Sequence, residues 1–160
     1  MIDRLTDKFY WPALVGAWVG VAVVASIILF DEAARVLTYP TQMGLAALCA
    51  TAFIVMLLDR KTRNAVNSYN FYIRDNRDEL KARQKELGWI RTFCRSDPDF
   101  PDPPLQRTLR AAWITGVITM FIGNKPASLI AFESFFLVGI MLMMRMKRGR
   151  WGAEWKEGAA

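Results

Sequence analysis

The feature that most constrains this sequence is an uncharged apolar block of about the length that a helix needs to cross a bilayer. The block is Trp11–Phe30 (WPALVGAWVGVAVVASIILF). Crossing a hydrocarbon core of about 30 Å takes roughly 20 helical residues, whose backbone polar groups must be satisfied within the helix. The block is too long for the apolar region of a signal peptide, and Asp31 and Glu32 follow it where a cleavage site would have small residues. We therefore interpret it as a retained first membrane-spanning helix.

Two further blocks have a similar character. Gln42–Leu58 is near the lower length limit for a span, and a loop from Asp31 to Thr41 is expected before it. Ala127–Met144 is the last block and contains one acidic residue, Glu133. A tight turn at residues 124–126 predicts that this block pairs with the preceding one as an antiparallel hairpin.

The remaining block, Ala111–Gly123, has only 13 uncharged residues. It crosses the bilayer if its helix begins near Leu105 and if Arg107 and Arg110 extend their guanidinium groups to the headgroups. A re-entrant or tilted half-span is the alternative.

The expected fold is an all-α membrane protein with about four transmembrane helices in two hairpins. Residues 1–58 form the N-terminal hairpin, 59–104 a cytoplasmic helix with a proline-rich connector, 105–144 the C-terminal hairpin, and 145–160 a basic cytoplasmic tail. Residues 59–95 look helical, whereas the four prolines within 98–104 predict an extended connector.

The distribution of Lys and Arg predicts the orientation. Of the 21 Lys and Arg residues, two precede the first block, twelve lie in 59–110 and five follow position 144; Arg35 and Lys125 account for the other two loops. Cytoplasmic loops carry such an excess, so both termini and the central segment are expected in the cytoplasm. The alanine- and arginine-rich composition fits a bacterial inner membrane.

Glu133 is the candidate functional residue within the membrane. An ionisable group inside a span is expensive in free energy and by default marks an ion site, a proton site or a contact with another helix. The alternative is that Glu133 only packs against a neighbouring helix or subunit, hydrogen-bonded or protonated there.

Three other sets of residues are candidates for contacts. Small residues four positions apart let helices approach closely, within the chain or with a partner: Gly16, Gly20, Ala46, Ala50, Ala112 and Gly116. Apolar residues seven positions apart predict a cytoplasmic partner helix: Val66, Ile73, Leu80 and Leu87. A basic, tryptophan-containing tail suits anionic headgroups or a partner: Arg145, Lys147, Arg148, Arg150, Trp151 and Trp155.

Several kinds of chemistry are disfavoured. The chain has no histidine, which removes histidine-based catalysis, bis-histidine haem ligation and most zinc sites. Cys49 and Cys94 lie in different environments, so neither a disulfide nor a shared metal site is expected, and Asp97, Asp99 and Asp102 lack the spacing of a calcium loop. We predict no catalytic residues, cofactor, metal or nucleic-acid partner.

Two functions remain. The first is a non-catalytic subunit of a multi-protein inner-membrane assembly, whose partners are the bilayer, other membrane subunits or further copies of itself, and a cytoplasmic protein. The second is a small homo-oligomeric channel or transporter with Glu133 in its pathway. A membrane-tethered adaptor acting through residues 62–95 overlaps with the first.

Overall fold

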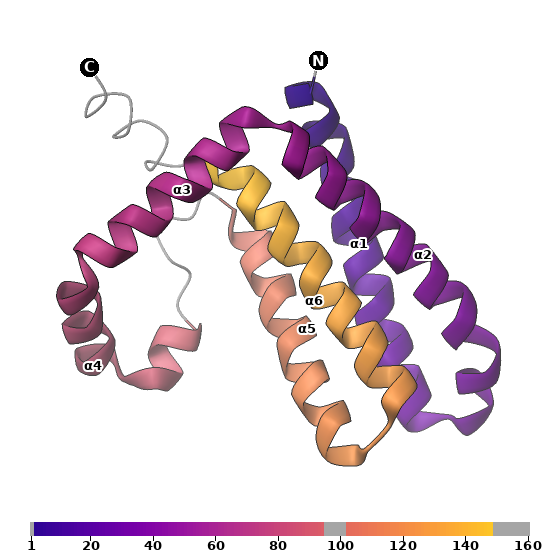
Figure 1. Ribbon diagram of the computed structural model, residues 1–160. Coiled ribbons are helices and arrows are strands. Elements are labelled where there is room, and N and C mark those ends of the chain that lie inside the picture. The colour runs from indigo at the N-terminus through magenta and orange to yellow at the C-terminus, as the bar shows by residue number, and fades with distance from the viewer. Residues whose placement is uncertain (1, 95–101, 149–160) are drawn as a thin grey trace.

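The computed structural model describes residues 2–94 and 102–148, and within these ranges the regular structure is entirely helical. Its six helices are α1 (Ile2–Leu29), α2 (Asp31–Leu58), α3 (Arg60–Asp75), α4 (Arg77–Cys94), α5 (Pro103–Ile122) and α6 (Lys125–Met146). Helices α1, α2, α5 and α6 form an elongated bundle, from one end of which α3 and α4 extend sideways (Figure 1).

Helix α6 is the centre of the bundle, because α1, α2 and α5 all pack along it and α3 packs on its last turns. The apolar residues that it buries recur on more than one of its faces: Ala127, Ile130, Ala131, Leu137, Val138, Ile140, Met141, Leu142, Met144 and Met146. A helix that is apolar all round is stable only when it is surrounded by other helices or by lipid.

Three helices are long and apolar enough to cross a membrane. These candidate spans are Asp7–Leu29, Val36–Leu58 and Lys125–Met146, and they make the chain a multi-pass membrane protein. Helix α5 runs antiparallel to α6 but is less apolar than the three candidate spans, because Arg107 and Arg110 lie in its first half.

The prediction of a loop from Asp31 to Thr41 is wrong, because these residues belong to α2. A single extended residue, Phe30 (φ −138°, ψ 108°), separates α1 from α2, which begins at Asp31 and continues through Pro40. Proline is tolerated in membrane helices because the groups that it leaves unpaired can be satisfied locally.

The second hairpin turns at Gly123 and Asn124, slightly earlier than expected. Gly123 adopts a left-handed conformation (φ 74°) that closes α5, and the side chain of Asn124 accepts a hydrogen bond from the Ala127 N–H (3.1 Å) that caps α6. Lys125 and Pro126 then form the first turn of α6, where proline loses no hydrogen bond.

The central segment is not one continuous helix. Helix α3 ends at Asp75 and is followed by its C-cap residue Asn76 (φ −106°, ψ 23°). Helix α4 is interrupted at Gly88 (φ 70°, ψ 154°), a conformation that favours glycine. After this break, the Phe93 ring packs against Trp113 of α5, with ring centroids 5.4 Å apart. The central segment therefore turns twice before it returns to the bundle.

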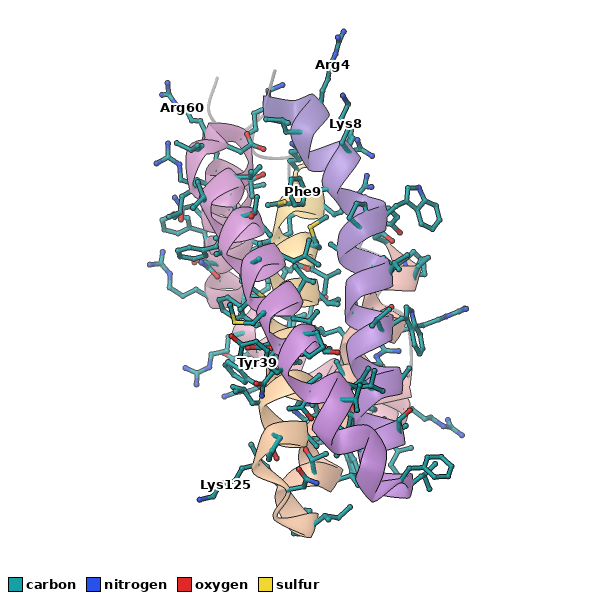
Figure 2. All side chains as sticks on the ribbon, turned by 90° about the vertical axis from the view of Figure 1, so that its right-hand side faces the viewer. Arg4, Lys8, Phe9, Tyr39, Arg60 and Lys125 are labelled. Carbon is teal, nitrogen blue, oxygen red and sulfur yellow. The ribbon has the colours of Figure 1, made fainter. Side chains whose placement is uncertain are left out.

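Basic residues from distant parts of the sequence gather at one end of the bundle. Arg4, Lys8 and Arg60 lie at that end and Lys125 lies at the other (Figure 2). The end of α2, the start of α5 and the end of α6 meet at the same place as the first turns of α1. The uneven distribution of Lys and Arg along the sequence thus places more of these residues at one end of the folded bundle than at the other.

Candidate functional site

The basic end of the bundle contains a cluster of ionised and polar side chains that joins every helix of the bundle. We call it the ion-pair cluster, and its members are Asp7, Tyr10, Asp59, Thr62, Asp102, Arg145, Lys147 and Arg148. Its three carboxylates and three cations balance in charge.

One half of the cluster is built around Arg145 at the end of α6. The Tyr10 hydroxyl donates a hydrogen bond to Asp102 Oδ1 (2.9 Å), and Arg145 Nε lies 3.5 Å from Asp102 Oδ2. The Arg145 guanidinium also stacks over the Tyr10 ring, 4.1 Å from its centroid. The Arg145 and Asp102 side chains are only 14% and 11% exposed, so this contact between α1, α5 and α6 is weakly screened by solvent.

The other half is built around Asp59, between α2 and α3. Lys147 Nζ lies 2.8 Å from Asp59 Oδ2, to which the Thr62 hydroxyl also donates (2.7 Å). The backbone N–H of Lys61 donates to Asp59 Oδ1 (3.1 Å), so the same carboxylate caps α3. Asp59 therefore fixes both the direction of α3 and the end of α6.

The pKa of Asp59 reflects these contacts. Burial alone raises the pKa of this carboxyl, but the hydrogen bonds from Lys147 and Thr62, the charge of Lys147 and the Lys61 N–H together outweigh burial and leave the pKa below its ordinary value. Asp59 is therefore ionised at neutral pH, which retains the ion pair.

Asp7 is the exposed member of the cluster. It pairs with Arg148 and lies 3.8 Å from Arg145 Nη1, but its side chain is 48% exposed. Exposed ion pairs contribute about 0–1 kcal/mol. The Asp59 and Asp102 contacts are therefore the ones that hold the helix ends together.

Sequence reasoning missed the cluster, although a signal was present. Asp59 directly follows one apolar block, Asp102 precedes the next, and Arg145 directly follows the last. Charges that flank block ends on the same side of the membrane are candidates for pairing. The sequence pattern alone predicts instead that the tail cations contact lipid or a partner.

Three of the six predicted tail residues belong to the cluster. Lys147 is largely buried, like Arg145, whereas the Arg148 side chain is 46% exposed. Arg150, Trp151 and Trp155 lie outside the described residues. A contact between this tail and headgroups or a partner stays a prediction.

Glu133 lies on α6, eight positions after its first residue. The Cys49 thiol of α2 contacts the Glu133 backbone oxygen at 3.4 Å. The carboxyl oxygen Oε2 is buried and has no hydrogen-bond partner among the described residues. An unpartnered buried oxygen at this depth is unfavourable, and a proton, a cation or a donor from another chain would satisfy it.

The Gly16 and Gly20 step packs inside the chain. A methyl group added to Gly20 would overlap Ser134 Oγ of α6, and one added to Gly16 would lie 2.8 Å from the end of the Leu48 side chain in α2. Ser134 is fully buried and donates to the Ile130 carbonyl (2.9 Å). Gly20 therefore allows α1 to approach α6 closely at Ser134.

The other predicted packing residues divide into two groups. Ala112 is buried, and Gly116 faces Ala131 of α6, so both lie between α5 and α6. Ala46 and Ala50 are exposed on the outer face of α2. This outward pair is available to lipid or to another helix.

The predicted partner stripe is divided between two helices. Val66 and Ile73 are on α3, whereas Leu80 and Leu87 are on α4 beyond the break at Asn76. All except Ile73, which is 37% exposed, are half-buried. The four residues do not form one straight stripe, and whether they bind a partner is a prediction.

Among the described residues, no three cysteine, aspartate or glutamate side chains lie close enough together to hold a metal ion. Cys49 is buried as a thiol, and Asp102 is engaged by Tyr10 and Arg145. Asp97 and Asp99 lie outside the described residues.

Comparison of the chain with protein-family models, with curated proteins and with solved structures finds no match. The geometry described above is therefore the basis of the functional argument.

Proposed function

We propose that this chain is a non-catalytic integral membrane subunit of a multi-protein inner-membrane assembly, and that α2 binds another subunit. The observation that carries the proposal is the outer face of α2. In Val36–Leu58, 17% of the most apolar stretch is buried within the chain, against 56% in Lys125–Met146. The middle of this outer face consists of small residues: Gly44, Ala46, Ala47 and Ala50.

Small residues on an exposed membrane-helix face favour association with another helix. Lipid tails are as apolar as leucine, so helices associate in membranes through close packing and hydrogen bonds. Large residues border the small ones along the same helix, with Met43 56% exposed, Ile54 56% and Leu57 47%. The small residues between them allow a second helix to approach α2 closely.

The topology that we propose has four spans, with both termini and the central segment in the cytoplasm. Helix α5 is the fourth span, and Arg107 and Arg110 extend from it toward the headgroups. Supporting this, α5 runs along α6, and its Leu105, Ala112 and Thr119 are buried in the bundle. The Lys and Arg residues at one end favour a cytoplasmic location for that end.

The test of the subunit proposal is a bulky substitution on the outer face of α2. Ala46→Leu with Ala50→Leu should reduce co-purification of native membrane partners in mild detergent several-fold, because the added side chains hold a partner helix away. Ala22→Leu with Ala25→Leu, two exposed alanines of α1, is the matched control and should retain the partners. Equal recovery from both variants, or a purified chain that has no partners, contradicts the proposal.

A channel or transporter is the second candidate, and the buried Glu133 Oε2 without a partner in the described structure favours it. Glu133→Gln removes the charge while keeping the shape. Purified protein in liposomes should lose proton or cation flux on this change if the carboxyl lies in a pathway. Unaltered flux eliminates the transport function and leaves the subunit proposal standing.

A further inference from the structure

Helix α3 separates its side chains into two faces. Its buried residues are Thr62, Ala65 and Ser68, and the helix packs against α6. With 3.6 residues per turn, the opposite side of the helix carries three arginines and two asparagines, all exposed, with the exposed Phe71 at its border under the Arg74 guanidinium: Arg60, Arg63, Asn67, Asn70 and Arg74.

The apolar face of α3 is longer than its contact with α6. Val66, Tyr69 and Ile73 continue the apolar side toward the end of the helix. Beyond its first turns, however, α3 leaves the bundle and extends sideways (Figure 1). Ile73, 37% exposed, therefore lies on an apolar face of α3 that extends beyond the contact of α3 with α6.

The position of α3 relative to the bilayer follows from α2. Only Asp59 separates the last residue of the candidate span Val36–Leu58 from the first residue of α3. Asp59 also caps α3 and binds Lys147 of α6. The start of α3 is thus held at the level where α2 and α6 leave the hydrocarbon.

We propose that α3 lies in the headgroup layer of the membrane that α2 crosses. Val66, Tyr69 and Ile73 lie toward the acyl chains, and Arg60, Arg63 and Arg74 bind the phosphates of anionic lipids. A helix with one apolar and one basic face is the form that lies in the interface plane, and basic residues next to a span attract anionic headgroups. Val66 and Ile73 then contact lipid, and Leu80 and Leu87 of α4 are left for a protein partner.

The first test is a nitroxide scan of the purified chain in nanodiscs containing phosphatidylglycerol. Labels are placed singly at 67, 69, 70 and 73 after Cys49→Ala and Cys94→Ser replacement. Sites 69 and 73 should react preferentially with oxygen, which partitions into lipid, and sites 67 and 70 with a water-soluble nickel complex. Preferential nickel access at 69 and 73 overturns the proposal, and so does protection of these sites from both reagents, which indicates a covering protein.

The second test concerns the arginines. An environment-sensitive fluorophore at 73 reports the depth of the helix in anionic and in zwitterionic nanodiscs. Arg60→Gln, Arg63→Gln and Arg74→Gln together should abolish the difference between the two lipids. The matched control neutralises three exposed cations of α4, Lys81, Arg83 and Lys85, and should preserve that difference. If both triple variants behave alike, α3 does not bind anionic lipid. Neither test requires a partner subunit, so each is independent of the proposed assembly.

Discussion

At the scale of single residues, the ion pair between Asp59 and Lys147 is the contact whose loss should destabilise the fold most. Both side chains are at least nine-tenths buried, and Asp59 also accepts hydrogen bonds from Thr62 and Lys61. Removing one partner of a buried ion pair costs about 3–5 kcal/mol, because the other charge stays buried without compensation.

Lys147→Met should therefore lower the unfolding midpoint of the purified protein, followed by helix circular dichroism in detergent. Adding Asp59→Asn should recover part of the loss, because asparagine keeps an acceptor for the Lys61 N–H without a buried charge. A double variant that is less stable than Lys147→Met would contradict this account of the pair.

The same carboxyl predicts a pH dependence. The pKa of Asp59 is lower in the folded protein than its ordinary value of 3.8, so its stabilisation is present above that value and is lost as the pH falls through the folded-state pKa. The stability difference between the wild type and Asp59→Asn should shrink below about pH 4. Unfolding midpoints measured from pH 7 downward test this, and a constant difference would argue against an ionised Asp59.

Tyr10 offers a smaller test on the other side of the cluster. Tyr10→Phe removes the hydrogen bond to Asp102 but keeps the ring under Arg145. The expected loss of stability is about 1–2 kcal/mol. Tyr39→Phe, at a position 70% exposed, is the control and should have no measurable effect in the same denaturation experiment.

At the scale of elements, the close approach of α1 to α6 at Gly20 can be tested with a second glycine as control. Gly20→Ala should destabilise the protein by about 1–3 kcal/mol, because the new methyl group overlaps Ser134 Oγ. Gly44→Ala meets nothing within 4 Å and should be neutral or slightly stabilising, since alanine favours helix.

Combining Gly20→Ala with Ser134→Ala removes the overlapping oxygen and should recover much of the stability. Thermal unfolding of the single and double variants would show the coupling. Independent, additive losses would mean that the two helices do not meet at this point.

The helices could be predicted from the sequence to different degrees. The spans were recognisable because a long apolar block has only one stable form in lipid. The start of α2 at Asp31 was not, because proline is typical of loops in most sequences, whereas a membrane helix tolerates Pro40 within it. The break at Asn76 was missed because the seven-residue repeat continues across it from Ile73 to Leu80, and Gly88 directly follows Leu87, the last member of that repeat.

The candidate site was predicted only in part. Glu133 stands out in any sequence because a charge within an apolar block is conspicuous. Asp59, Asp102 and Arg145 are ordinary charges at block ends until the fold brings them together from positions far apart in the sequence. Which flanking charges pair depends on the order of the helices around α6, and a single sequence contains no direct record of that order.

At the scale of the whole molecule, the segregation of basic residues predicts the topology. A cysteine at position 83 and one at position 125, each introduced singly after replacement of Cys49 and Cys94, should react with an impermeant maleimide from opposite sides of the membrane. The reason is that α6 separates Lys125 from the end that contains Arg60 and Lys147. Labelling of both from one side would mean that α6 does not cross.

The ion-pair cluster also has a consequence for biogenesis. Lys147 is 88 residues beyond Asp59 in the chain, which at 5–20 residues per second corresponds to roughly 4–18 s of translation. During that interval Asp59 has emerged from the ribosome and its cation has not. The ion pair that joins the end of the first hairpin to the end of the second can therefore form only after the last helix has been synthesised.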